Sequence, residues 1–89
     1  MLPKSADLNG ALLEVLRANP DGLQSKVIDD QVQRLLQISE EDMKIMRNAN
    51  RSEFAYRLAW ERTHAKNKGL IIRLPGNVWK IVNDEKTNN

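Results

Sequence analysis

Residues 52–70, SEFAYRLAWERTHAKNKGL, predict one long helix that carries basic and aromatic side chains together. Ser52 is a candidate N-cap, and Glu53 behind it suits the positive end of the helix dipole. Lys66 suits the last turn, and Gly69 can take the left-handed conformation that ends a helix. The rest of the chain can be interpreted as the scaffold for this helix.

A short β-hairpin is predicted directly after the helix. Two apolar runs, Leu70–Leu74 and Val78–Val82, flank the turn sequence Pro75-Gly-Asn77. A basic helix followed by a basic hairpin is typical of a winged helix-turn-helix, in which the helix enters a DNA groove and the hairpin is the wing. The predicted fold class is therefore mainly α with a small β-hairpin.

Alternation along the hairpin predicts which side chains face the core. The inward set is expected to be Leu70, Ile72, Leu74, Trp79 and Ile81. Arg73 and Lys80 would then share the exposed side, beside Asn77 in the turn, where cations can lie against a phosphate backbone. The alternative is a solvated hairpin whose charges only protect a sheet edge.

The first helix is expected to start at a cap formed by Asp7 or Asn9 and to end near Arg17. Its apolar stripe consists of Leu8, Leu12, Leu13 and Leu16. The sequence Asn19-Pro-Asp-Gly22 indicates a turn, and Leu23-Gln24 is a candidate first strand that pairs with the wing.

Two further helices are predicted before the long one. Ser25 is expected to cap the second helix, and Ser39 with the three acidic residues after it predicts a short third helix. The apolar residues of the second helix are Val27, Ile28, Val32, Leu35 and Leu36. The residues expected to pack the third helix on the core are Met43, Ile45 and Met46. Asn48-Ala-Asn50 is expected to end the third helix and to form the connection into the long helix.

The chain has 89 residues and no cysteine, which excludes disulfides and thiolate zinc sites. Its length fits one domain, which we place at residues 1–82, with a polar tail or the start of a linker at residues 83–89. No apolar run approaches the roughly 20 residues that span a bilayer, and the first residues lack the apolar segment of a signal peptide. We therefore expect a cytoplasmic protein with no membrane contact.

Charge is unevenly distributed along the chain. Residues 1–43 hold four basic and eight acidic groups, a balance of −4, whereas residues 44–89 hold ten basic and four acidic groups, a balance of +6. This asymmetry is expected when one face meets phosphate, although the net charge is only +2. The alternative is a polarised surface without a partner.

Catalytic and cofactor motifs are missing from the sequence. There is no Gly-rich phosphate loop, no HExxH pair and no nucleophile elbow. The single histidine, His64, is expected at the helix surface. Helix N-termini explain the acidic runs Asp29-Asp30 and Glu40-Glu41-Asp42 better than a metal site does. We therefore expect no catalytic residue, no metal ligand and no cofactor, and a chain that is not an enzyme by itself.

The long helix and the hairpin supply the predicted DNA contacts. Arg57, Trp60 and Asn67 fall on one face of the helix, and Arg and Asn can read guanine and adenine edges. Arg62 and Lys66, one turn apart, are expected to follow a phosphate strand. Trp60 is interpreted first as a core residue that anchors the helix to the hairpin, and alternatively as the wall of a base pocket. The full predicted DNA-binding set is Arg51, Arg57, Trp60, Arg62, Lys66, Asn67, Arg73, Asn77 and Lys80.

Several stretches resemble the N-terminal winged-helix domain of Mrr-type restriction proteins. Residues 50–60, NRSEFAYRLAW, match a last helix that carries Arg-x-x-Trp, and residues 66–71, KNKGLI, match a Gly-Leu-Ile that leads into the wing. Residues 12–16 and 38–41 match the family's first helix and its Leu-Ser-Glu-Glu-like helix start.

The resemblance covers about residues 3–82 and implies a DNA-recognition module. In full-length relatives a separate nuclease domain of the PD-(D/E)xK type follows and cuts modified DNA. No such domain is in this sequence, so cleavage is not carried over. The sequence departs from the family after the wing, where Val82-Asn-Asp-Glu85 replaces the family's Thr-x-x-Gly.

Two functions follow from these observations. The leading hypothesis is recognition of double-stranded DNA, with modified bases as a candidate target, for a restriction-type protein that has a C-terminal effector domain or acts as a homodimer. The alternative is a winged-helix module that binds another protein, or dimerises, without DNA. The salt dependence of duplex binding distinguishes the two.

Overall fold

The structure is a computed structural model that describes residues 2–82, and the predicted tail at residues 83–89 lies outside the described residues. The helices are α1 (Ser5–Ala18), α2 (Ser25–Leu35), α3 (Glu40–Met43) and α4 (Glu53–Asn67). The strands are β1 (Leu23–Gln24), β2 (Met46–Asn48), β3 (Arg51–Ser52), β4 (Ile71–Leu74) and β5 (Val78–Ile81). The expected mainly helical domain with a small β-hairpin is confirmed, and the element order is compatible with a winged helix-turn-helix.

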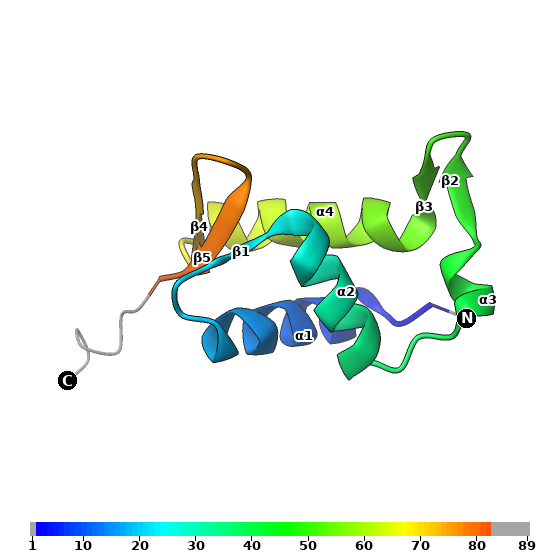
Figure 1. The fold of residues 1–89 in the computed structure, drawn as a ribbon, viewed down its shortest axis with the longest axis horizontal. Helices are drawn as coiled ribbons and strands as arrows, with labels where there is room; N and C mark the ends of the chain where they lie inside the picture. The colour runs from blue at the N-terminus through cyan, green and yellow to red at the C-terminus, as the bar shows by residue number, and fades with distance from the viewer. Residues whose placement is uncertain (1, 83–89) are drawn as a thin grey trace.

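The core forms where α1, α2 and α4 meet. Figure 1 shows α1 and α4 running in the same direction, one below the other, with α2 crossing beside them. The largest fully buried side chains are Phe54, Leu8, Leu12, Leu16, Ile28, Leu58, Ile71 and Val32. The leucine stripe predicted for α1 is therefore buried at three positions, whereas Leu13 is only partly buried. Burying such a side chain contributes about 1.5–3 kcal/mol, so the α1 stripe is a main source of the domain's stability.

A three-stranded antiparallel sheet packs at one end of this core, in the order β1-β5-β4. Leu23 in β1 pairs with Trp79 in β5, which confirms the predicted first strand. The Trp79 indole Nε1 donates a hydrogen bond to the Ser25 hydroxyl at 2.9 Å and so ties β5 to the start of α2. Ser25 is the first residue of α2 and Gln24 holds the cap position, so the predicted Ser25 cap is wrong.

The start of α1 also differs from the prediction. The helix begins at Ser5, with Lys4 in the cap position and no side-chain hydrogen bond there. Its first backbone bond runs from the Leu8 amide to the Lys4 carbonyl at 3.0 Å. Asp7 and Asn9 therefore lie inside the helix, and the predicted start at either residue is wrong.

The predicted caps of α3 and α4 are confirmed. The Ser39 hydroxyl accepts a hydrogen bond from the Asp42 amide at 3.1 Å, and the Ser52 hydroxyl accepts one from the Ala55 amide at 3.1 Å. Gly69, at φ 79°, ends the long helix in the left-handed region. Both ends of α4 are thus set by local sequence.

Part of the predicted core is exposed instead. Val27 and Leu35 on α2 are exposed, and so are Ile45 and Met46 after α3. Of the residues expected to pack α3, Met43 alone contacts the core cluster. Because α3 has a single turn, the chain leaves the core directly after Met43 and carries the next apolar residues outward.

The strand phase predicted for β4 is wrong by one residue. Ile71 is buried, whereas Leu70 and Ile72 are exposed. The Leu70 amide donates to the Ala65 carbonyl at 2.9 Å, so Leu70 belongs to the turn that ends α4. The strand therefore starts one residue later, and a shift of one residue exchanges the two faces of a strand.

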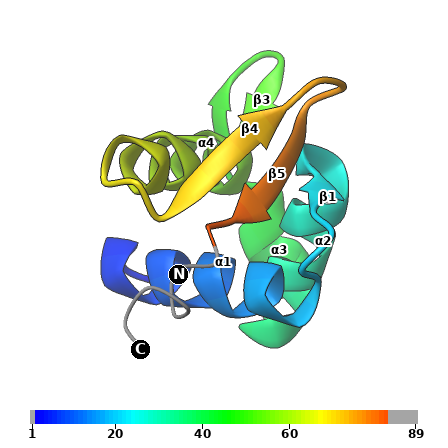
Figure 2. The ribbon, with the colours of Figure 1, turned by 90° about the vertical axis from the view of Figure 1, so that its left-hand side faces the viewer.

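A second hairpin, formed by β2 and β3, was not predicted. We call residues 46–52 the inserted hairpin and residues 71–81 the C-terminal hairpin. In the inserted hairpin the Asn50 amide donates to the Asn48 side-chain carbonyl at 2.8 Å, so the residues expected to end the third helix and to lead into the long one form a turn between paired strands. Figures 1 and 2 show the two hairpins at opposite ends of α4, projecting to the same side of the molecule.

Candidate nucleic-acid interface

The outward face of α4 lies opposite the core. The residues that α4 buries are Phe54, Leu58, Glu61, Arg62 and Ala65. Helical spacing places Tyr56, Trp60, Thr63 and Asn67 on the other side of the helix. Trp60 and Asn67 are exposed, and Tyr56 and Thr63 are partly exposed. This face, framed by the two hairpins, is the candidate interface.

Trp60 is the largest side chain on the interface. It is 49% exposed, so its interpretation as a core residue is wrong. The core position expected for it is taken by the second tryptophan, Trp79, which is 7% exposed. The Trp60 ring lies 5.7 Å from the His64 ring, centroid to centroid, and His64 is exposed on the surface as predicted.

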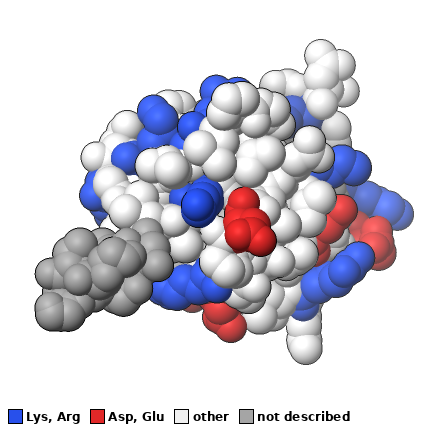
Figure 3. Space-filling view, turned by 60° about the vertical axis from the view of Figure 1, so that its left-hand side comes forward, with Lys and Arg blue, Asp and Glu red and all other residues white. Residues whose placement is uncertain are grey.

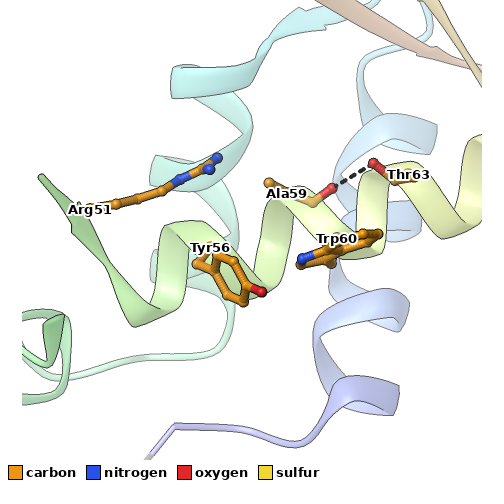
Figure 4. Close-up of a pocket in the computed structure, with 5 residues that line it drawn as sticks. All are labelled: Arg51, Tyr56, Ala59, Trp60 and Thr63. Carbon is orange, nitrogen blue, oxygen red and sulfur yellow. Dashed lines mark hydrogen bonds between the residues drawn. The ribbon is translucent and has the colours of Figure 1, made fainter. Parts of the chain in front are cut away.

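An open groove runs beside the Trp60 ring (Figure 4). Its volume is about 360 Å³, and it is lined by Arg51, Tyr56, Ala59, Trp60 and Thr63. In Figure 4 the Arg51 side chain extends along the helix, toward the middle of the groove. The Thr63 hydroxyl, on the groove wall, donates to the Ala59 carbonyl at 3.2 Å. The groove thus combines apolar walls with one guanidinium group.

Tyr56 is fixed by a residue from the inserted hairpin. The Arg47 guanidinium carbon lies 4.1 Å from the centre of the Tyr56 ring, and Arg47 Nη2 donates to the Tyr56 hydroxyl at 3.3 Å. Arg47 Nη1 also lies 3.7 Å from a Glu53 carboxylate oxygen. Sequence reasoning missed both Arg47 and Tyr56. The spacing of Tyr56, one turn before Trp60, was the signal that could have identified it.

Arg57 lies at the edge of this face and is held by neighbours. Its Nε donates to a Glu53 carboxylate oxygen at 2.8 Å, one helical turn back, and its Nη1 donates to the Pro3 carbonyl at 3.5 Å. The Arg57 side chain keeps 44% of its surface exposed. Arg57 can therefore bind a ligand only if its ion pair with Glu53 is broken or shared with that ligand.

Arg62 points into the protein. It is 7% exposed, and its Nη1 donates to a carboxylate oxygen of Asp29, on α2, at 3.0 Å. Its guanidinium carbon lies 5.5 Å from the centre of the Trp79 ring, and its Nε has no hydrogen-bond partner among the described residues. Burial raises the pKa of the Asp29 carboxyl, and the charge of Arg62 lowers it only in part. Arg62 therefore joins α4 to α2 and does not reach the surface where DNA was expected.

The two basic residues of the C-terminal hairpin lie on opposite faces. Arg73 pairs with Trp79 and Lys80 pairs with Ile72, so the expectation that both cations share one side is wrong. The Arg73 guanidinium carbon lies 5.7 Å from the centre of the Trp79 ring. Asn77, at φ 61°, is exposed in the turn between the strands.

The remaining cations do not form one continuous patch. Figure 3 shows Lys and Arg side chains scattered among neutral residues on the side that carries the C-terminal hairpin. Lys66 and Asn67 are exposed in the last turn of α4, next to that hairpin. The structure thus brings Arg51, Trp60 and Asn67 to the outward face, leaves Arg57 at its edge and removes Arg62 from it.

Residues 2–82 contain neither a membrane-spanning helix nor a metal-binding cluster. That part of the chain has no helix with the length and apolar content needed to cross a membrane. Within the same residues no three His, Asp or Glu side chains are grouped so that they could hold a metal ion.

No curated protein and no solved structure gives a significant match to the chain. A family model, described as the Mrr N-terminal domain, matches residues 7–86 and so covers the described chain from the first turn of α1 to the end of β5. The chain therefore belongs to the Mrr N-terminal domain family, which associates it with restriction systems.

Proposed function

We propose that this domain recognises double-stranded DNA for a restriction-type protein, with α4 in the major groove and the C-terminal hairpin on the phosphate backbone. The observation that carries the proposal is the exposure of Trp60 in the middle of α4, beside the partly exposed Tyr56. Aromatic side chains are enriched in binding interfaces relative to the rest of a protein surface. The major groove, about 12 Å wide, admits an α-helix.

The chemistry of the groove favours a methylated base as the target. In the major groove thymine presents a C5-methyl group, which apolar side chains contact, and a methyl group on C5 of cytosine occupies the same place. The faces of Trp60 and Ala59 can cover such a methyl group. The Arg51 guanidinium, on the same groove, can donate to a guanine edge or to a phosphate.

The proposal assigns recognition and not cleavage to this domain. Cutting would require a nuclease domain, either elsewhere in a longer parent protein or in a partner. The backbone contacts proposed for Lys66, Arg73 and Lys80 would supply most of the affinity, and the groove would supply selectivity.

The test is a pair of fluorescence-anisotropy titrations, one with a plain duplex and one with the same duplex methylated at cytosine C5. We expect Trp60→Ala to weaken binding of the preferred duplex by about tenfold or more, the size of an interface hot spot. The matched control is Leu35→Ala, which removes an exposed apolar side chain from α2. Equal affinity of the wild type and Trp60→Ala for the preferred duplex would contradict the proposal.

Protein binding is the second candidate function. It is supported by the exposed apolar side chains Trp60, Ile72, Ile45 and Met46, because aromatic residues and methionine are enriched in interfaces. The partner would be a second copy of the domain or the effector domain of the parent protein. Sedimentation at increasing protein concentration without DNA tests it: a dimer that Trp60→Ala dissociates would favour this function.

A further inference from the structure

The inserted hairpin occupies a position that no sequence motif indicated. It joins α3 to α4 and contacts the first turns of α4, whereas the C-terminal hairpin contacts the last turns. In Figures 1 and 2 both hairpins rise on the same side of the molecule, with α4 between them. The two hairpins therefore stand at opposite ends of α4, on the side of the helix that is away from α1 (Figure 1).

The composition of the inserted hairpin resembles that of the C-terminal hairpin. Its turn residues, Asn48, Ala49 and Asn50, are flanked by the exposed cations Arg47 and Arg51, and residues 46–51 contain no acidic group. The turn of the C-terminal hairpin, Pro75-Gly-Asn77, also has two cations near it, Arg73 and Lys80, which lie on opposite faces of the strands. Both hairpins thus have asparagine in the turn and cations nearby, and they lie at opposite ends of α4.

The inserted hairpin is held in place before any ligand arrives. Arg47 stacks on Tyr56 at 4.1 Å and lies 3.7 Å from Glu53, and the Glu53 amide donates to the Ile45 carbonyl at 2.8 Å. These contacts fix the hairpin to the first turn of α4. Binding therefore costs less conformational entropy than it would with a flexible loop.

We propose that the inserted hairpin is a second DNA-contacting arm, and that Arg47 and Arg51 bind the phosphate backbone at the end of α4 opposite the C-terminal hairpin. A helix of 15 residues is about 22 Å long. Arms at its two ends can therefore contact the phosphate backbone at two separate points while α4 lies along the groove. This inference rests on the proposed DNA-binding function.

Hydroxyl-radical footprinting of a duplex, together with affinities at several salt concentrations, tests the proposal. The wild type should protect two separate backbone segments, one near each end of α4. Arg47→Ala/Arg51→Ala should remove one segment, and Arg73→Ala/Lys80→Ala should remove the other. Each double variant should reduce the slope of log affinity against log salt by about 1.8, the value for two phosphate contacts.

A matched control separates specific contacts from loss of charge. Arg17→Ala/Arg34→Ala also removes two positive charges, from the last turns of α1 and α2. It should keep both protected segments. The single variant Arg51→Ala leaves the Arg47 contacts in place, and should weaken the same protected segment even if the double variant unfolds.

The outcomes distinguish this inference from the proposed function. If the wild type binds duplex but Arg47→Ala/Arg51→Ala and Arg51→Ala behave like the control, the second arm is refuted and the proposed function survives. If the wild type does not bind duplex at all, the proposed function fails, and the inference fails with it.

Discussion

Two arginines five positions apart on α4 differ in their exposure to solvent and in the carboxylate that each one binds. Arg57 is exposed and bonded to Glu53 within its own helix, whereas Arg62 is buried and bonded to Asp29 on another helix. An exposed pair at this spacing is worth roughly 0.3–0.5 kcal/mol, because water screens it. A buried pair stabilises less than its geometry suggests, yet removing one partner leaves a buried charge behind.

Arg62→Ala should therefore lower the free energy of unfolding by about 2–3 kcal/mol, somewhat less than a fully buried pair, because Asp29 keeps a quarter of its side chain exposed. The loss of Arg62 should also raise the pKa of the Asp29 carboxyl further above its ordinary value, since Arg62 is the main group that lowers it. Urea unfolding and NMR titration of the Asp29 carboxyl measure the two effects. Arg57→Ala is the control and should change stability by less than about 0.5 kcal/mol.

Lys66→Ala should weaken plain and methylated duplexes alike, because a phosphate contact carries no sequence information. The slope of log affinity against log salt should fall by about one charge.

Arg57→Ala should instead cost about 1–3 kcal/mol of binding free energy on the preferred duplex if Arg57 leaves Glu53 to read a base edge. Anisotropy titrations of both variants on both duplexes test this. Unchanged discrimination by a folded Arg57→Ala would show that the arginine serves only its ion pair.

At the scale of elements, the sequence predicted what local chemistry determines. The caps at Ser39 and Ser52, the left-handed Gly69 and the turn at Pro75-Gly-Asn77 were all visible as short motifs. The sequence could not show which side chains of β4 face the core. An apolar residue such as Leu70 fits the end of a helix and the start of a strand equally well, so the first residue of the strand was undetermined. The inserted hairpin was missed because its strands have two or three residues, too few to show an alternation.

The same limit applies to the candidate site. Exposure of Trp60 and burial of Arg62 depend on which tryptophan fills the core and on where Asp29 of α2 lies, and neither is a property of α4 alone. Residue type and helical spacing could place Trp60 and Asn67 on one face. They could not show that Arg47, from a separate hairpin, would stack on Tyr56 of that face.

The turn between α1 and β1 provides a test at this scale. Gly22 has φ +97°, and a Cβ atom there would lie 2.9 Å from Val78 Cγ1 and 3.1 Å from the Trp79 carbonyl oxygen. Gly22→Ala should therefore lower the free energy of unfolding by about 1–3 kcal/mol, through strain and contact with β5. Gly10→Ala, in the open on α1, should instead raise it by about 0.5–1 kcal/mol. Thermal unfolding of both variants measures this, and equal effects would show that Gly22 does not limit the packing of β5.

At the scale of the whole molecule, the basic residues are spread over two hairpins and one helix face. The net charge is only +2, and Figure 3 shows neutral residues between the cations. Attraction to DNA must therefore come from how the cations are placed around α4 rather than from total charge. Arg51, Lys66, Arg73 and Lys80 have side chains exposed or partly exposed at the helix ends and on the hairpins.

The most direct test of the account is a titration of labelled duplex with the domain at several salt concentrations. We predict a dissociation constant of about 10⁻⁴–10⁻⁶ M for a random duplex at physiological salt. The logarithm of the affinity should fall linearly with the logarithm of salt concentration, with a slope of roughly −4 to −5 for the five phosphate contacts proposed at Arg47, Arg51, Lys66, Arg73 and Lys80. Absence of binding, or a slope near zero, would contradict DNA recognition and favour the protein-binding function.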